Sequence, residues 1–421
     1  MTSSPDRAAS RAEVDRLVEP LFRRASARLV AALVRALGPG QLALAEEAVQ
    51  EALLRALQTW PHGGVPADPE GWLVRVAKNA ALDRVRREQR FAERAPHVVR
   101  AVEDALAATA EREDDALRLV FLCCHPALSP DARVALTLKN VAGFGVGEIA
   151  RAFLAREDAI AQRLVRARRT LAELEPAFLL DAGDIAERLP SVHEVLYLIF
   201  NEGYAAHAGS NLVREDLVRE ALRLGAVLAA HPAGDVPATH ALVALMALQA
   251  ARIPARVDKA GELVRLEDQD RTRWDPALVR LGHAALEASA SGSVETVYHL
   301  QAAIAGVHAA APDDARTDWA RILMLYDRLL ALAPTPIVAL NRAVALARVD
   351  GPAAGLAEVE ALAASPPGKL ERYYLLPATR ADLLERLGRR DEARAAYREA
   401  LACPCSEPER RHLERRSSAC E

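Results

Sequence analysis

Apolar side chains recur at helical spacing in two basic segments of the chain. In the second half of residues 145–173 the apolar positions follow the spacing i, i+4, i+7, i+11 and are Ile160, Leu164, Ala167 and Leu171. In residues 68–91 a comparable stripe consists of Leu73, Val76, Ala77, Ala80 and Ala81. Such spacing is typical of an amphipathic helix that buries one face. Both segments are therefore predicted to be helices.

Helix breakers divide the first part of the chain into a series of helices. Helices are expected over about Val14–Leu37 and Leu42–Thr59, and a Gly/Pro-rich loop over 61–71 precedes the helix with the stripe. A charged tether over 96–113 leads to a second helical unit over 114–175, which ends in a helix, a short turn and a second helix. The predicted fold class is all-α.

The polar faces of the two basic helices carry side chains that suit nucleic acid. Opposite the first stripe lie Trp72, Arg75, Asn79, Arg86 and Arg90. Opposite the second lie Ala159, Gln162, Arg166 and Arg169. Arginine, amide and aromatic groups contact phosphates, base edges and unstacked bases. Two alternatives stay open, namely that Trp72 anchors the core and that the second helix is merely solvated.

The charge is distributed unevenly. The chain has a net charge of -4, but residues 1–176 hold 26 basic and 24 acidic side chains, against 28 and 34 in residues 177–421. Basic side chains concentrate in 72–94 and 156–169, and acidic ones in 46–51. This pattern predicts two nucleic-acid contacts and a basic protein partner.

The composition argues against a membrane or secreted protein. The chain is 51% hydrophobic but only 4% aromatic, and no apolar run approaches 18 residues. The charged first residues lack the apolar core of a signal peptide. Five cysteines without a CxxC pair suggest reduced thiols. A cytoplasmic protein is expected.

Small residues at matched positions near the C-terminal end suggest helical repeats. Ala343 and Gly355 are 12 residues apart, as are Ala381 and Ala393, and Gly388 falls in the turn between the second pair. Small residues where two antiparallel helices touch resemble a tetratricopeptide (TPR) repeat. Such modules mostly bind peptides or protein surfaces.

No arrangement of residues indicates catalysis or a cofactor. His125 follows Cys123 and Cys124 without a second spaced pair of ligands, which favours packing over metal binding. Tyr197 stands where an HExxH motif beginning at His193 would need its second histidine. His299 and His308 lack a nearby nucleophile pattern, and "NEGY" (201–204) favours a turn. We expect no enzyme, no catalytic residue, no metal and no cofactor.

Two stretches resemble regions of extracytoplasmic-function (ECF) sigma factors, which belong to the sigma-70 superfamily. "AEEAVQEALLRALQTWP" with "GWLVRVAKNAALDRVRRE" resembles region 2, and "GEIARAFLAREDAIAQRLVRARRTL" resembles region 4. The remainder resembles the extension of one ECF subgroup with a helical domain and TPR-like repeats. The resemblance implies a region 2 helical bundle (12–95), a linker (96–113), a region 4 helix-turn-helix (114–175), a helical extension domain (187–310) and TPR-like repeats (317–416).

The resemblance also implies functional residues and partners. Contacts to the clamp helices of the β′ subunit of core RNA polymerase would come from Glu46, Glu47, Gln50, Glu51 and Arg55. Contacts to the −10 promoter element would come from Trp72, Arg75, Asn79, Arg86, Arg87 and Arg90. Contacts to the −35 element would come from Arg156, Gln162, Arg163, Arg166, Arg168 and Arg169. The β flap and a protein or peptide bound by the TPR-like repeats are further expected partners, and promoter DNA is the expected ligand.

Region 4 departs from the family pattern at its turn. Leu154 and Arg156 stand where members usually carry glycine and a capping Ser or Thr, so that Asp158 becomes an alternative cap that would shift the helix start. The competing function is a helix-turn-helix regulator with a TPR-like sensor that binds duplex DNA but not polymerase. The loop 61–71 and the Trp72 face argue against it, because a duplex binder has no use for them.

Overall fold

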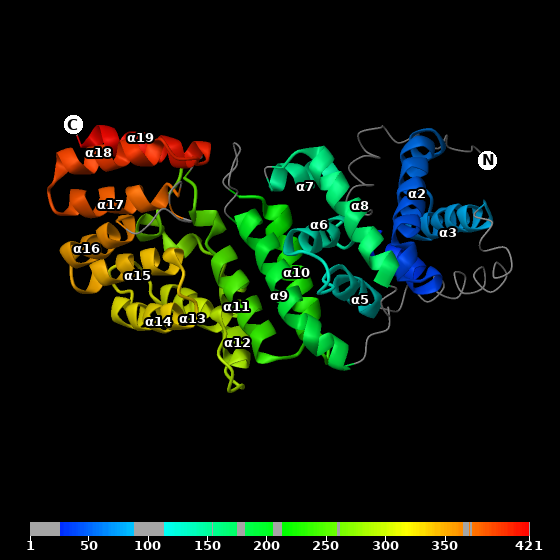
Figure 1. Cartoon of the computed structure of the whole chain (residues 1–421), viewed down its shortest axis with the longest axis horizontal. Coiled ribbons are helices and arrows are strands. Elements are labelled where there is room, and N and C mark those ends of the chain that lie inside the picture. The colour runs from blue at the N-terminus through cyan, green and yellow to red at the C-terminus, as the bar shows by residue number, and fades with distance from the viewer. Residues whose placement is uncertain are drawn as a thin grey trace, which may run out of the picture. The chain divides into compact units, whose positions relative to one another are not determined.

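The computed structural model describes residues 26–87, 113–153, 155–174, 182–204, 213–258, 262–364, 370 and 373–420. Within these residues the protein is helical, and the prediction of an all-α fold is confirmed (Figure 1). The only bridge among them pairs Val257 with Leu263 in antiparallel fashion. The chain divides into two compact units, residues 1–198 and 199–421, which are described separately.

The first unit contains the helices that carry the two basic faces. After a helical segment over 26–37, its elements are η1 (Pro39–Gln41), α2 (Leu42–Gly63), α3 (Pro69–Arg87), α5 (Glu113–Cys123), α6 (Pro130–Asn140), α7 (Val146–Ala152), α8 (Glu157–Leu174) and the first part of α9 (Ala182–Tyr204). Helix α2 packs against α3, while α8 packs against α6 and α7. Arg90 and most of the predicted linker lie outside the described residues.

The loop between α2 and α3 is shorter than predicted, because both helices extend into 61–71. Helix α2 continues through Pro61 to Gly63, and its end is held by Trp60, which is 2% exposed. Burial of this indole offsets the hydrogen bond that proline cannot donate. Helix α3 starts at Pro69 because Asp68 accepts a hydrogen bond from the Gly71 amide at 2.9 Å. The loop therefore comprises residues 64–68.

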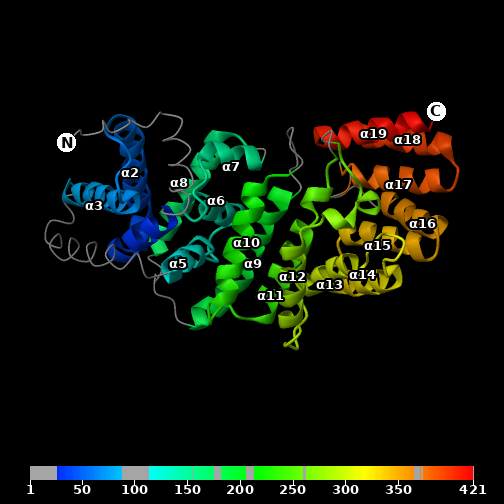
Figure 2. The same ribbon diagram turned by 180° about the vertical axis from the view of Figure 1, so that it is seen from behind.

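The second unit is a succession of helices packed against their chain neighbours (Figure 2). After the end of α9 its elements are α10 (Glu215–Ala230), α11 (Pro237–Ala250), the short turns η4 (Ile253–Ala255), η5 (Leu266–Asp268) and η6 (Arg271–Arg273), α12 (Pro276–Ser289), α13 (Val297–Ala310), α14 (Trp319–Leu332), α15 (Pro336–Val349), α16 (Pro352–Ala363), α17 (Leu375–Arg386), α18 (Arg390–Leu401) and α19 (Glu407–Ala419). We call α14–α19 the C-terminal helix stack.

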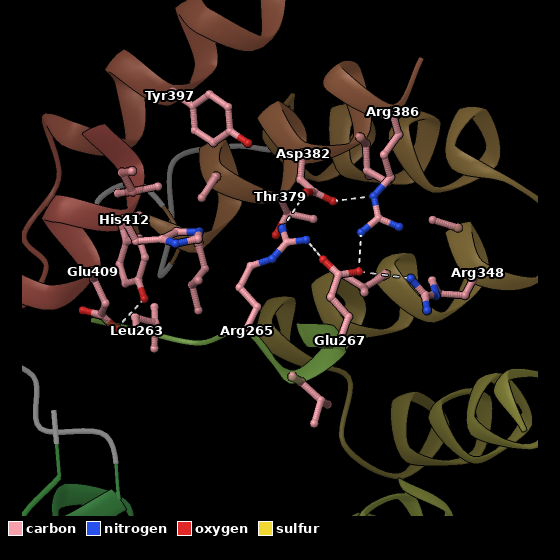
Figure 3. A pocket seen from close by; sticks show the side chains of 18 of the residues that line it. Leu263, Arg265, Glu267, Arg348, Thr379, Asp382, Arg386, Tyr397, Glu409 and His412 are labelled. Atoms are coloured by element: carbon pink, nitrogen blue, oxygen red, sulfur yellow. Dashed lines mark hydrogen bonds and ion pairs between the residues drawn. The ribbon is translucent and has the colours of Figure 1, made fainter. Parts of the chain in front are cut away.

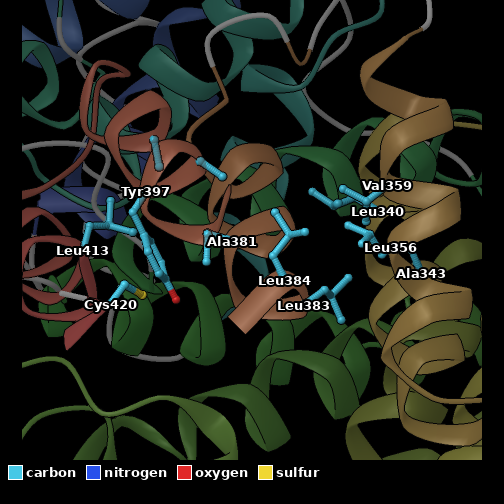
Figure 4. Close-up of a cluster of buried hydrophobic side chains, with 13 residues drawn as sticks. Leu340, Ala343, Leu356, Val359, Ala381, Leu383, Leu384, Tyr397, Leu413 and Cys420 are labelled. Carbon is cyan, nitrogen blue, oxygen red and sulfur yellow. The ribbon is translucent and has the colours of Figure 1, made fainter. Parts of the chain in front are cut away.

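Small residues allow close helix contacts in the C-terminal helix stack, as the sequence predicted. A Cβ atom on Gly355 would lie 2.5 Å from the Cβ of Ala347 and 2.7 Å from the carbonyl oxygen of Ala343. Ala381 and Ala393 are fully buried in the same apolar cluster (Figure 4). Gly388 turns the chain between α17 and α18 with φ +76°, a conformation that residues with a Cβ rarely adopt.

Candidate functional site

Helix α3 has the two faces that its sequence predicted. Leu73, Ala77, Ala80 and Ala81 are buried and Val76 is partly buried, whereas Arg75 and Asn79 are exposed. Arg86 and Arg87 form the last turn of α3. The exposed face therefore offers one guanidinium and one side-chain amide to solvent on a helix whose other side is fixed in the core.

Trp72 lies between these two faces. Its ring is partly buried and packs edge-on against Trp60 of α2, with ring centroids 5.5 Å apart and an interplanar angle of 66°. Gly64, the first residue after α2, begins the loop 64–68 with φ +78°. The indole is thus oriented by a buried aromatic neighbour, while part of its surface stays accessible for stacking.

The acidic residues of α2 pair with arginines of the same unit. Arg84 of α3 lies 3.3 Å from a carboxylate oxygen of Glu47 and donates to Glu51 at 2.9 Å. Arg55 donates to Glu51 at 2.5 Å, one turn away on α2. Glu47 and Gln50 are exposed. Arg84 was missed by the sequence analysis, although its position on α3 facing α2 is one that the helical period could have indicated.

Glu46 is buried, unlike the other predicted polymerase contacts. It is 5% exposed, and one of its carboxylate oxygens accepts a hydrogen bond from Nε of Arg168 at 3.0 Å. A second bond joins Nη2 of Arg168 to the other oxygen, so the pair is bidentate. Burial raises the pKa of Glu46, and the charges of Arg168 and Lys139 partly offset that rise.

This pair connects the acidic helix α2 with the basic helix α8 within the first unit. Glu46 belongs to the predicted polymerase-binding residues, and Arg168 to the predicted DNA-binding residues. Since each side chain is occupied by the other, neither is free for an outside partner in this arrangement. Periodicity in the sequence gave no signal of the contact, because it joins residues 122 positions apart.

Helix α8 buries its apolar seam and exposes its polar face. Ile160, Leu164, Ala167 and Leu171 are at most 3% exposed, which confirms the seam predicted from their spacing. Gln162, Arg166 and Arg169 are exposed. Arg163 is half-buried and lies 3.2 Å from Asp131 of α6. The exposed side chains present an amide and two guanidinium groups along one side of the second helix of a helix-turn-helix.

The turn before α8 settles where this helix begins. Helix α8 starts at Glu157, so Asp158 lies in its first turn and does not shift its start. Arg156 precedes the helix and donates to Asp158 at 2.8 Å. The carboxylates of Glu157 and Asp158 are favourable there, because the first turn of a helix carries partial positive charge.

Among the thiols and histidines singled out in the sequence, Cys123, Cys124 and His193 are buried. Cys123 and Cys124 are fully buried, and burial raises the pKa of Cys124 to about 12. Burial lowers the pKa of His193 to about 4. Among the described residues no group of three or more His, Cys, Asp or Glu side chains could hold a metal ion. None of the described helices is long and apolar enough to cross a membrane.

Comparison with protein families divides the chain into three parts. The family model "Sigma-70 region 2" matches residues 22–91, and "Sigma-70, region 4" matches residues 118–171. A family of unknown function (DUF6596) matches residues 188–290. The first two segments include the helices α2, α3 and α8 that carry the candidate contacts.

Individual relatives match different shares of the chain. An uncharacterised protein of Rhizobium meliloti (strain 1021) is 42% identical over 369 residues, which cover 86% of each chain. A probable ECF RNA polymerase sigma factor, SigI of Mycobacterium tuberculosis (strain H37Rv), is 30% identical over 151 residues, which cover 33% of this chain and 51% of that protein. No solved structure matches the chain significantly.

Proposed function

Because the chain belongs to the sigma-70 family, as an ECF sigma factor with an additional C-terminal domain, we propose that it directs core RNA polymerase to specific promoters. The face of α3 with Trp72 and the loop 64–68 would engage the opened −10 element. The exposed face of α8 would read the −35 element in the major groove. The carboxylates of α2 would dock on the β′ clamp helices, and the β flap is the proposed further contact of polymerase.

One observation supports this proposal most strongly. Helix α8 buries four apolar side chains and leaves Gln162, Arg166 and Arg169 exposed, while α3 in the same unit exposes Arg75 and Asn79 beside Trp72. A duplex reader explains the first surface, since arginine and glutamine recognise base edges in the major groove. It does not explain the second, which pairs an aromatic ring with a short loop suited to an unpaired base.

The competing function is a regulator that binds duplex DNA without polymerase. A pull-down of core RNA polymerase by the purified full-length chain separates the two. A sigma factor retains core enzyme, and the triple substitution Glu47→Gln, Gln50→Ala, Glu51→Gln weakens that retention because it removes proposed contacts on α2. A chain that binds duplex DNA and retains no core enzyme would support the competing function.

The pair between Glu46 and Arg168 gives the first unit a closed arrangement. We propose that polymerase binding separates this pair, which would free Glu46 for the β′ subunit and Arg168 for DNA phosphate. Buried ion pairs are costly to break from one side but can be exchanged when both partners find new ones. Promoter recognition would then depend on core enzyme.

We also propose that the C-terminal domain is required for activity rather than acting only as a mask. Its extent, more than half of the chain, supports this proposal. A shortened chain should keep α9, because Ser191 of that helix accepts a hydrogen bond from Arg133 of α6 at 2.9 Å. Transcription by residues 1–204 at or above the full-length level would contradict the requirement.

A further inference from the structure

A charged segment of the chain lies in a pocket of the second unit. Residues 262–268, here called the strap, belong to the connection between α11 and α12 and run between α15, α17 and α19 (Figure 3). Within the strap, Leu263 forms the bridge to Val257, Arg265 has extended backbone, and the single turn η5 follows.

Both ends of the strap present a carboxylate to paired arginines of the helix stack. Glu262 accepts a hydrogen bond from Nε of Arg411 at 2.8 Å and a second from Arg415, both on α19. Five residues later, Glu267 accepts from Arg348 of α15 at 3.1 Å and from Arg386 of α17 at 2.7 Å. The helices thus form two guanidinium clamps, each suited to a carboxylate.

Between the clamps the polarity is reversed. Arg265 of the strap donates to Asp382 of α17 at 2.5 Å. Asp382 is itself held by Arg386 at 2.8 Å and by Arg416 at 3.1 Å, which fixes its carboxylate in place. The arginines and Asp382 of the helix stack therefore match a segment with the order acidic, two residues, basic, one residue, acidic, which is the order of Glu262, Arg265 and Glu267. Arg348, Asp382 and Arg386 line the pocket, whereas the clamp of Arg411 and Arg415 lies outside its wall.

The strap neither fills the pocket nor joins the helices through its backbone. A cavity of about 320 Å³ remains there, and Trp319, Tyr374, Tyr397 and His412 contribute to its wall. Among the described residues, the strap's main-chain hydrogen bonds to other segments run to Arg256 and Asp258 of its own connection. Its charged side chains contact the helices through partly exposed ion pairs, which individually contribute little. Leu263 and Leu266 of the strap also line the cavity.

We propose that this pocket is a binding site for an acidic segment of another protein, and that the strap is its internal occupant. The partner segment carries two carboxylates five residues apart with a basic residue between them, and it displaces the strap from the two arginine clamps. Helix-stack proteins present their inner surfaces to extended peptides in this manner. This inference rests on the proposed function, because it states which kind of peptide the C-terminal domain of the sigma factor would bind.

The internal occupant weakens binding of any outside segment. Because the strap is tethered to the helix stack, it occupies the clamps as if it were present at a millimolar concentration. A free peptide of equal affinity therefore binds only those molecules in which the strap has dissociated from the clamps. Loosening the strap without altering the clamps should therefore tighten peptide binding. Altering the clamps should weaken it.

The test is fluorescence polarisation with a labelled peptide of the strap sequence, ELVRLED, and the full-length chain. The strap variant with Glu262→Gln and Glu267→Gln should bind the peptide at least about tenfold more tightly than the unaltered chain, because the competitor is removed. Adding Arg411→Ala and Arg415→Ala to that variant should abolish the gain. Glu358→Gln is the matched control, since this carboxylate also pairs with an arginine, Arg342, at 2.5 Å but belongs neither to the strap nor to the two clamps.

Several results would overturn the inference. Equal binding of ELVRLED and QLVRLQD would show that the clamps do not recognise carboxylates, and equal binding by the strap variant and the unaltered chain would show that the strap is no competitor. Should the strap variant fail to fold, hydrogen exchange at residues 262–268 of the unaltered chain must increase when millimolar ELVRLED is added; no increase refutes the proposal. The assay contains neither polymerase nor DNA, so its failure is distinct from failure of the sigma function.

Discussion

Replacing Arg168 by methionine is expected to tighten the binding of core RNA polymerase and to weaken the binding of promoter DNA. In the structure Arg168 is 22% exposed and Glu46 is 6% exposed in their side chains. Removing one partner of a buried ion pair costs about 3–5 kcal/mol, because the other charge stays uncompensated. Here Lys139 and the raised pKa of Glu46 both reduce that cost, so we expect about 2 kcal/mol against the closed arrangement.

A change of about 2 kcal/mol shifts the ratio of closed to open molecules by roughly 30-fold. In the proposed mechanism only open molecules present Glu46 to polymerase, so Arg168→Met should bind core enzyme about tenfold more tightly or better. The same substitution removes a proposed phosphate contact, so the salt dependence of promoter binding should fall by about one ion. Titration of labelled protein with core enzyme, and of holoenzyme with promoter DNA at several salt concentrations, measures both effects.

The matched control is Arg169→Met on the same helix. Arg169 is 77% exposed in its side chain and, within the part of the chain that the structure describes, pairs with Glu173, one turn along α8, at 3.2 Å. Its loss should weaken DNA binding and leave the affinity for core enzyme unchanged. If Arg168→Met binds core enzyme no more tightly than Arg169→Met, the closed arrangement does not restrict access to α2 and the reasoning is refuted.

Four further substitutions test separate parts of the account. Arg166→Ala should weaken binding to the −35 element by about 1–3 kcal/mol and relax its sequence preference, whereas a uniform loss on all DNA sequences would make Arg166 a phosphate contact. Trp72→Ala should cost about 1–2 kcal/mol in stability through its contact with Trp60, and should impair promoter opening while core binding is kept; loss of the circular-dichroism signal of region 2 would instead identify a core anchor. Burial lowers the pKa of His308 to about 3 in the folded chain, so burying this neutral imidazole lowers the free energy of unfolding by about 1.4 kcal/mol for each pH unit below 6.5, or about 2 kcal/mol at pH 5, and by nothing above pH 6.5. His308→Gln should therefore remove this part of the loss of stability in acid, as measured by denaturant melts at several pH values. An unchanged pH profile would refute the prediction. Gly355→Ala should lower the free energy of unfolding by about 1–3 kcal/mol, because the new methyl group overlaps Ala347 and the Ala343 carbonyl. The control is Gly63→Ala, where no atom lies within 4 Å of the new methyl group; it should change the free energy of unfolding by no more than about 0.5 kcal/mol in the same thermal melts.

The features that the sequence predicted correctly are those set by local periodicity. The seam from Ile160 to Leu171 is buried as its spacing indicated, because an amphipathic helix buries its apolar stripe and leaves its polar face in water. The close contact at Gly355 and the turn at Gly388 followed from the steric properties of glycine. These predictions needed no knowledge of distant residues.

The features that the sequence analysis missed depend on contacts between distant segments. Glu46 lies one turn from the buried Leu42 and Val49 on α2, and its buried carboxylate is paired with Arg168, which is 122 positions away. The strap resembles a solvated charged loop by composition, yet Arg265 and Glu267 meet residues more than 80 positions away. At Pro61 the packing of Trp60 outweighed a strong local breaker. In each case tertiary contacts override a sound local rule.

Run-off transcription tests the central claim most directly. Core RNA polymerase would be supplied with a library of genomic fragments, with or without the full-length chain, and the transcripts sequenced. The account predicts discrete start sites that share upstream −10 and −35 sequences and that appear only when the chain is added. The absence of any dependent transcript, from a chain that still binds duplex DNA, would contradict it and favour a regulator that acts without polymerase.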